Sequence, residues 1–265
     1  MEDSRLEEYE KAIYGDTRGS NLYNENVYDI WTTWLYLAGI EKPEQYNSQD
    51  IVLNQELMQR VMGNEAAVKY MLNSKYFIMP KVLKSEVAMS EARKSNVTVK
   101  AILENGDWIS EFKYNVLPVM SSNITEGVKL TVSNGVVNET AYKITDGNSS
   151  TGCDTISGNY DIHWIQIEFA KPKYVTNYYL LGMASGGALP TFYIDASNDG
   201  TNWTRIEGET VHTGNASHYS GQKEFNVDIE SPGFYKYYRI YSPTGGWTYG
   251  SSGSYFVTVF KLFGL

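Results

Sequence analysis

The sequence predicts a helical N-terminal region with short repeats, followed by an all-β region folded as an antiparallel β-sandwich. Three observations indicate this α plus all-β, multidomain class. Apolar residues recur at helical spacing before residue 63, a short repeat fills residues 64–113, and runs of alternating apolar and polar residues follow from residue 116. We therefore divide the chain into residues 1–63, 64–115 and 116–265.

Residues 1–63 have the apolar spacing of short amphipathic helices. We predict helices around residues 6–13, over 27–38 and over 51–63, with Gly63 ending the third. The second helix is more apolar than so small a region needs, and exposed apolar patches mark partner surfaces. We therefore expect a partner surface at Trp31, Trp34 and Leu35.

Residues 64–113 contain units that open with Asn or Ser, which favour a helix N-cap, and carry apolar residues at the same following positions. The units begin at Asn64, Ser74, Ser85, Ser95 and Asn105. Two geometries satisfy this repeat: one continuous helix with an apolar stripe, or short helices stacked on one another. Pro80 would break or kink a continuous helix, and the regular caps also favour short stacked helices.

Residues 116–265 contain short alternating runs separated by Gly, Pro, Ser and Asn, which predict an antiparallel sandwich. The predicted strands cover residues 129–134, 164–169, 174–183, 192–197, 223–229, 235–242 and 256–264. Tyrosine is the commonest aromatic residue, with 22 Tyr against 9 Phe and 6 Trp. Tyrosine suits half-buried strands and contact surfaces, because it joins an apolar body to a polar tip.

Composition disfavours several classes of function. The net charge of −9 argues against a nucleic-acid partner, and no apolar stretch is long enough to predict membrane insertion. The single cysteine, Cys153, excludes an intrachain disulfide and is expected to be a small buried residue. The acidic N-terminus lacks the apolar core of a secretory signal. No catalytic motif stands out, so we expect no enzyme. Pairs of acids such as Asp195 with Asp199 lie in strands and turns without a visible site.

Five motifs follow one another in the second half: AYKITDGNSST at 141–151, WIQIEF at 164–169, ASNDGTNW at 196–203, YYRI at 237–240 and LFG at 262–264. In this order they resemble coagulation factor 5/8 type C (discoidin-like) domains and the related family-32 carbohydrate-binding modules. The resemblance implies a discoidin-like jelly-roll sandwich that binds carbohydrate.

The resemblance also implies a structural calcium ion beside the DGNSST loop, with Asp146 and Thr151 as candidate ligands. Val259 stands near the place where the family often has a glutamate. Calcium prefers six to eight oxygen ligands, so one acid with backbone carbonyls would make a weak site. We therefore expect no certain cofactor and keep calcium as an open prediction.

A glycine- and serine-rich loop over residues 242–255 interleaves aromatic rings, which suit the C–H faces of sugars. The candidate glycan-binding residues are Trp247, Tyr249 and Tyr255, with a second group at Asn159, Tyr160 and His163. In the similar carbohydrate-binding modules, the loop before the last strand commonly carries such a ring. The alternative is that Trp247 caps the end of the sandwich.

The repeats resemble the serine-capped units of bacteriophage tail and fibre proteins, and Ser85–Met89 (SEVAM) is the nearest unit. Together the two resemblances imply a virion structural protein, assembled in the host cytoplasm, whose sandwich binds a host-surface glycan. Residues 1–115 would then contact other virion proteins, and we expect a homo-oligomer because stacked repeats need neighbours. Two alternatives stay open: a bacterial carbohydrate-binding protein or accessory module, and a virion protein that binds no glycan.

Overall fold

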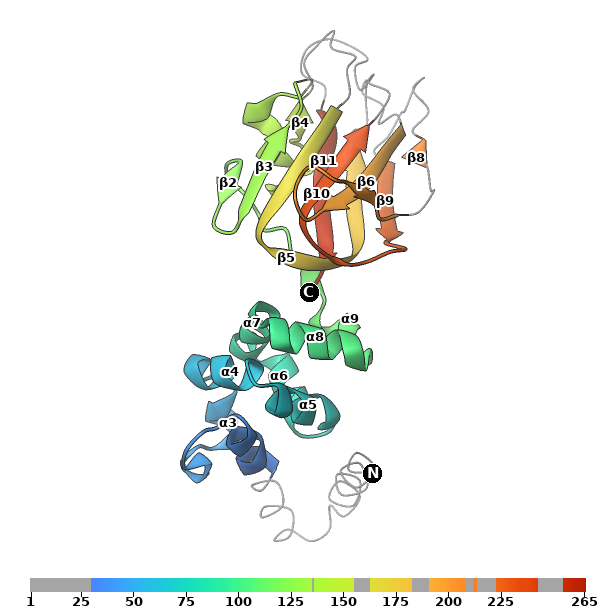
Figure 1. Cartoon of the computed structure of the whole chain (residues 1–265). Coiled ribbons are helices and arrows are strands. Elements are labelled where there is room, and N and C mark those ends of the chain that lie inside the picture. Colours follow the sequence, from blue (N-terminus) through green and yellow to red (C-terminus); the bar gives the residue numbers. More distant parts are fainter. Residues whose placement is uncertain are drawn as a thin grey trace. The chain divides into compact units, whose positions relative to one another are not determined.

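The computed structural model describes residues 30–134, 136–154, 163–182, 191–207, 212–213, 223–242 and 255–265. The chain divides into two compact units, Met1–Lys113 and Tyr114–Leu265 (Figure 1). The division lies close to the boundary predicted at 115/116. The two predicted helical regions, 1–63 and 64–115, meet within the first unit.

The first unit consists of short helices, and the predicted helix around residues 6–13 lies outside the described residues. Residues 30–37 are helical, and the third predicted helix is divided in two at residues 52–54. The later elements are η1 (Pro43–Gln45), α3 (Ser48–Ile51), α4 (Gln55–Met62), α5 (Glu65–Asn73), α6 (Ile78–Lys84), α7 (Glu86–Lys94), α8 (Asn96–Asn105) and α9 (Ile109–Phe112).

The repeat forms separate helices, which confirms the stacked-helix alternative. Ser74 and Asn105 are not the N-caps that the repeat predicts, because α6 and α9 begin later, after Phe77 and Trp108. The side chains of Asn64, Ser85 and Ser95 each accept a hydrogen bond from the backbone N–H three residues later, at 3.0, 3.2 and 3.2 Å. Pro80 does not break its helix, because it is the third residue of α6, where a backbone N–H has no partner within the helix.

Ser and Thr side chains of the repeat helices also donate hydrogen bonds to backbone carbonyls at the end of an earlier helix. The Ser95 hydroxyl donates to the carbonyl of Met62, and Thr98 Oγ1 donates to the same oxygen at 2.7 Å. The Ser85 hydroxyl donates to the carbonyl of Val52 in the same way. These contacts satisfy carbonyls that a helix end leaves without a partner, so the caps also join the helices into one core.

The prediction of a partner surface on the second helix is wrong. Trp31, Trp34 and Leu35 are all buried, with exposed fractions of 5%, 0% and 0%. The Trp34 indole N–H donates to the carbonyl of Ala67 at 3.0 Å, and its ring meets that of Trp31 edge to face. The apolar side chains therefore form the core of the helical unit, where the sequence alone suggested an excess.

The second unit is the predicted antiparallel sandwich. Its strands are β1 (Tyr114–Asn115), β2 (Ile124–Thr125), β3 (Val128–Val132), β4 (Cys153–Asp154), β5 (His163–Gly182), β6 (Thr191–Ser197), β7 (Thr204–Arg205), β8 (His212–Thr213), β9 (Lys223–Asp228), β10 (Phe234–Ser242) and β11 (Tyr255–Gly264). A 3₁₀ helix, η2 (Asn138–Thr145), precedes the DGNSST loop. Every paired strand is antiparallel to its partner.

The long strand β5 joins the two sheets. Its first half pairs with β3 and β10, and its second half pairs with β11 and β9. Figure 1 shows β5 curving from one sheet into the other. The sequence predicted two strands here, but the chain continues through the exposed residues 170–172 as one strand. Pro172 is tolerated because its neighbours include a bulge in the pairing with β10.

Inward side chains of both sheets form one core. Alternation along β5 and β10 turns Ile165, Ile167, Tyr238 and Ile240 inward, where each is at most 1% exposed. Cys153 is buried in the same core, as expected for a small apolar residue. The alternate residues of these strands face outward, and they form the polar and aromatic surface considered below.

Candidate functional site

The two predicted groups of glycan-binding residues attach to strand ends that pair with each other. Ser242 at the end of β10 pairs with His163 at the start of β5. Tyr255 at the start of β11 pairs with the end of β4. Segment 155–162 joins β4 to β5, and segment 243–254 joins β10 to β11. Each segment therefore connects the β4–β11 pair to the β5–β10 pair, and both attach at one end of the sandwich.

Most of the predicted glycan contacts fall on those segments. Asn159, Tyr160, Trp247 and Tyr249 lie outside the described residues, so their roles stay predictions. His163 is within β5 and fully buried, with its imidazole on the inward face of the strand. A direct contact between His163 and a sugar would require this imidazole to become exposed, so the burial argues against that role.

The predicted calcium loop is held by its own hydrogen bonds. The Asp146 carboxylate accepts the backbone N–H of Asn148 at 2.7 Å and the Thr151 hydroxyl at 2.6 Å. Gly147, with φ of +80°, lets the chain turn between them. The loop thus supplies one carboxylate whose two oxygens already accept donors, and this donor set does not fit calcium without rearrangement. Calcium stays a prediction.

The ASNDGTNW turn is built around Asp199. Its carboxylate accepts the backbone N–H groups of Asn202 and Thr201, at 2.7 and 2.8 Å, and the side-chain N–H of Asn202 at 2.7 Å. These hydrogen bonds, led by the one from the backbone of Asn202, hold the pKa of Asp199 well below its usual range. The turn places Trp203 directly before β7.

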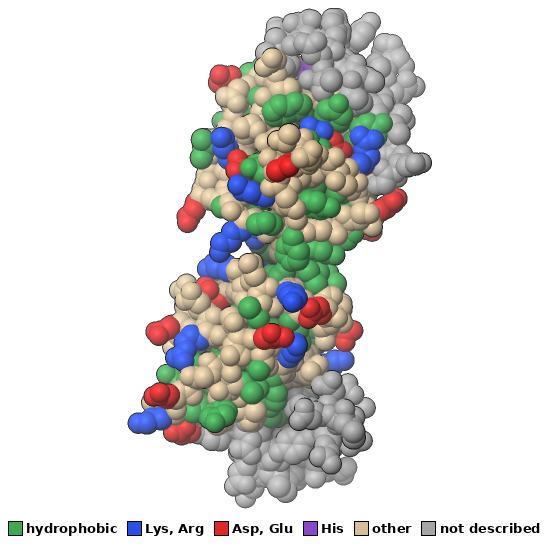
Figure 2. All heavy atoms as spheres, viewed as in Figure 1, with side chains coloured by type: hydrophobic (Ala, Val, Ile, Leu, Met, Phe, Trp, Pro, Cys, Tyr) green, Lys and Arg blue, Asp and Glu red, His purple; other side chains and the backbone are tan. Residues whose placement is uncertain are grey.

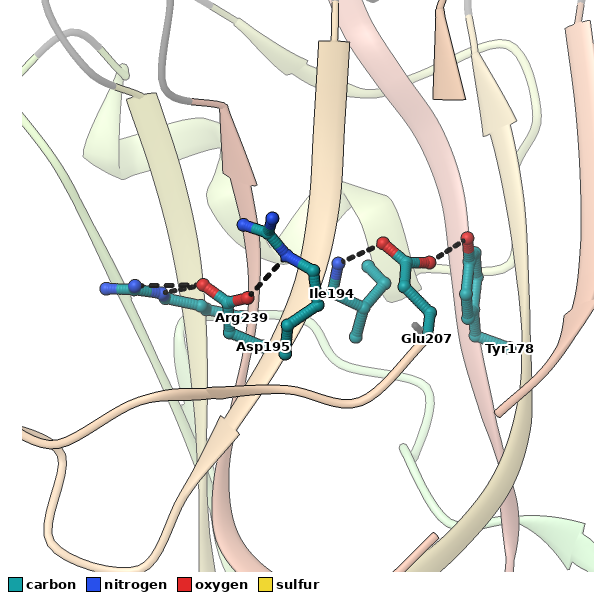
Figure 3. Close-up of polar contacts among 6 residues, drawn as sticks. Tyr178, Ile194, Asp195, Glu207 and Arg239 are labelled. Atoms are coloured by element: carbon teal, nitrogen blue, oxygen red, sulfur yellow. Dashed lines mark hydrogen bonds and ion pairs between the residues drawn. The ribbon is translucent and has the colours of Figure 1, made fainter. Parts of the chain in front are cut away.

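A buried carboxylate ties the two sheets together (Figure 3). Glu207 is 1% exposed, and it accepts the Tyr178 hydroxyl and the backbone N–H of Ile194, each at 2.6 Å. Tyr178 lies in the second half of β5, whereas Ile194 lies in β6 of the opposite sheet. Burial and the neighbouring carboxylate raise the pKa of Tyr178 far above its usual value.

A second carboxylate, Asp195, holds two arginines on the outward face of β6 (Figure 3). Arg239 of β10 directs Nε and Nη2 to Asp195 Oδ2, at 3.1 and 2.9 Å. Arg205 of β7 places Nε 3.5 Å from Asp195 Oδ1. The Asp195 side chain is 6% exposed, whereas that of Arg205 is 37% exposed. Of the two partners in this ion pair, Arg205 is therefore the one whose side chain solvent reaches.

Aromatic rings surround these arginines. The Arg239 guanidinium lies 4.1 Å from the centre of the Trp203 ring and 4.4 Å from that of Tyr241. The Arg205 guanidinium lies 3.2 Å from the centre of the Tyr193 ring. Contacts of this kind attract a cation to a ring face. In Figure 2, Lys or Arg side chains lie beside hydrophobic side chains over the region of β6 and β10.

Sequence reasoning missed this arrangement although it quoted two of its members. Arg239 belongs to the YYRI motif and Trp203 to the ASNDGTNW motif, and in the sequence both motifs indicate the fold and no binding site. Strand alternation could have placed Tyr241 on the same outward face as Arg239. The contacts with Tyr193 and Arg205 depend on the register between strands, which the sequence does not give.

Comparison with known families finds a match within the sandwich. Residues 129–254 match the F5/8 type C domain. The match confirms the resemblance predicted for the C-terminal half, and the antiparallel sandwich agrees with it. No match supports the resemblance of the helical repeats to bacteriophage proteins, and no curated protein matches the chain.

Solved structures similar to the chain include carbohydrate-binding modules. The family 32 module from Clostridium perfringens NanJ, in complex with galactose, has 16% identity and a TM-score of 0.39, covering 51% of this chain and 93% of its own. A chitosan-binding module from a Paenibacillus sp. IK-5 chitosanase/glucanase has 24% identity and a TM-score of 0.39, covering 56% of this chain and 98% of its own.

Two other kinds of site are absent from the described ranges. There, no three His, Cys, Asp or Glu side chains gather closely enough to hold a metal ion. In the same part of the chain, no helix is both long and apolar enough to cross a membrane.

Proposed function

We propose that this chain is a carbohydrate-binding protein whose sandwich binds a glycan at the end where segments 155–162 and 243–254 attach. The match of residues 129–254 to the F5/8 type C domain carries this proposal. The pairing of Ser242 with His163 supports it, because this pairing brings the attachment points of both aromatic groups together. We assign the chain a binding role and no catalysis.

In this proposal Trp247 is the main platform for a sugar ring, with Tyr249 and Tyr255 beside it. Aromatic faces contact the C–H patches of a sugar, and neighbouring hydroxyl and amide groups fix its orientation. Asn159 and Tyr160 would contribute from the second segment.

Binding of the full chain to a glycan array, before and after Trp247→Ala, tests the proposal. A ring that contributes most of a contact behaves as a hot spot, so its loss should weaken binding by about 2 kcal/mol or more. Tyr36→Ala, at a side chain that is 73% exposed in the helical unit, is the control and should leave binding unchanged. A large loss of thermal stability with unchanged binding would instead show that Trp247 caps the sandwich.

For the biological setting we propose a bacteriophage virion, where the helical unit would attach the sandwich to other virion proteins and form a homo-oligomer. The resemblance of the serine-capped repeats is the support for this setting. The alternative, a bacterial carbohydrate-binding protein or accessory module, is equally consistent with the family match. Neighbouring genes for virion proteins, or antibody labelling of purified particles, would support the virion. Genes for polysaccharide degradation would support the alternative.

A virion protein that binds no glycan is the remaining candidate. It predicts attachment to particles together with no binding across the array.

A further inference from the structure

The outward face formed by β5, β10 and β6 carries a row of aromatic residues. Register places Tyr241 of β10 opposite both Trp164 of β5 and Tyr193 of β6. All three residues are half-buried. Neighbouring strands lie about 4.8 Å apart, so the row extends about 10 Å across the sheet.

The neighbouring row carries the charges. Arg239 pairs with Asp195 in the register of β10 and β6, and Arg205 pairs with Asp195 in the register of β6 and β7. Two guanidinium groups therefore share one carboxylate, which leaves one positive charge in excess within the group. Because the Arg239 side chain is 17% exposed and that of Arg205 is 37% exposed, the accessible part of this charge lies mainly on Arg205. We call these six residues, Trp164, Tyr193, Asp195, Arg205, Arg239 and Tyr241, the outer-face cluster.

We propose that the outer-face cluster binds an acidic glycan, with the carboxylate of a sugar ring on Arg205 and apolar parts of the glycan against the exposed parts of the aromatic row. The proposal extends the proposed function, since it names a substrate class, but it uses different residues from the end of the sandwich. A guanidinium group binds a carboxylate by paired, charge-assisted hydrogen bonds. Asp195 and the ring of Tyr193 hold Arg205 in position before a ligand arrives.

The charge of the whole chain favours a glycan over other anionic partners. The net charge is −9, so an acidic protein surface or a nucleic acid would bring many negative charges against an acidic molecule. A short acidic glycan can place one of its ring carboxylates on one accessible cation, and the cluster offers one positive charge in excess. A neutral sugar would make no use of that charge.

Galacturonic acid trimer and its methyl ester form a matched pair of probes, because they differ in the carboxylate and share the sugar rings. Calorimetric titration of the full chain should give tighter binding of the acid than of the ester. Arg205→Gln should weaken binding of the acid about tenfold and leave binding of the ester unchanged. The affinity of Arg205→Lys for the acid should lie between those of the wild type and Arg205→Gln. Lys261→Gln removes another cation that lies over a tyrosine ring, on β11 of the other sheet, and should change neither titration.

Several results would overturn the proposal. Equal binding of acid and ester, no binding of either, or an equal effect of Arg205→Gln and Lys261→Gln would each do so. Poly-glutamate that binds through Arg205 in the absence of trimer binding would assign the cluster to an acidic protein.

Trp247→Ala separates the two proposals. If it abolishes glycan binding on the array while Arg205→Gln changes nothing, the end site stands and the outer-face cluster fails. If only Arg205→Gln weakens binding of the trimer, the outer-face cluster stands and the site at the end of the sandwich fails.

Discussion

Removal of the Tyr178 hydroxyl tests whether the buried contact with Glu207 stabilises the sandwich. Tyr178→Phe keeps the ring, which packs against Phe260 with 6.2 Å between ring centres, so little core volume is lost. The Glu207 carboxylate, 1% exposed, loses a donor at 2.6 Å that water cannot easily replace. A hydrogen bond to a charged group contributes about 1.5–3 kcal/mol, so we expect the free energy of unfolding to fall by about 2 kcal/mol.

Urea unfolding of residues 114–265, with the fold checked by circular dichroism, measures this change. Tyr237→Phe is the matched control, because its hydroxyl lies 3.2 Å from Glu168 at a half-buried position. Water can replace the lost hydrogen-bond partner at that position, so the free energy of unfolding should fall by less than about 1 kcal/mol. Equal effects of the two substitutions, or no effect of Tyr178→Phe, would refute the argument that burial makes this contact strong.

Three other results are expected. Ser95→Ala removes an N-cap and should lower the free energy of unfolding of the helical unit by about 1 kcal/mol. The control, Ser90→Ala inside α7, should change this free energy little. Chemical denaturation measures both. Burial raises the pKa values of Tyr178 and Tyr238, so above pH about 10 the unfolded chain loses these protons while the folded chain keeps them. Stability should therefore fall as pH rises, less steeply in Tyr178→Phe, in urea titrations at pH 9–11. Calcium and a chelator should give equal melting temperatures, because both Asp146 oxygens already accept donors of their own loop; a rise with calcium that Asp146→Ala abolishes would instead establish the ion.

Local signals predicted much of the fold, because the features concerned are set by residues close in sequence. The caps at Ser85 and Ser95 bind backbone groups three residues away, and the strand alternation in β5 and β10 depends on neighbouring positions. The burial of Trp34 is not predictable from its neighbours, because its partner, the carbonyl of Ala67, lies on another helix. Nothing local indicates whether a tryptophan will fill a core or remain exposed.

The site was less predictable for the same reason. The loop aromatics could be proposed from composition, but the outer-face cluster needs the registers of β10 with β6 and of β6 with β7. A shift of one residue in either register would turn these side chains to the other face. The YYRI motif gives the position of Arg239 in the chain and says nothing of the strands that pair with it.

Three acids of the sandwich, Asp195, Asp199 and Glu207, differ in what they contact. Asp195 and Asp199 are close in sequence, yet Asp195 holds two arginines on the face of the sheet, while Asp199 accepts the backbone donors of its own turn. Glu207 is buried between the sheets, where it accepts Tyr178 and Ile194. A pair of catalytic carboxylates must flank a substrate so that one can donate a proton and the other can assist. These three carboxylates are each held by neighbours within the fold, and Asp195 in particular positions cations that a negatively charged ligand can reach.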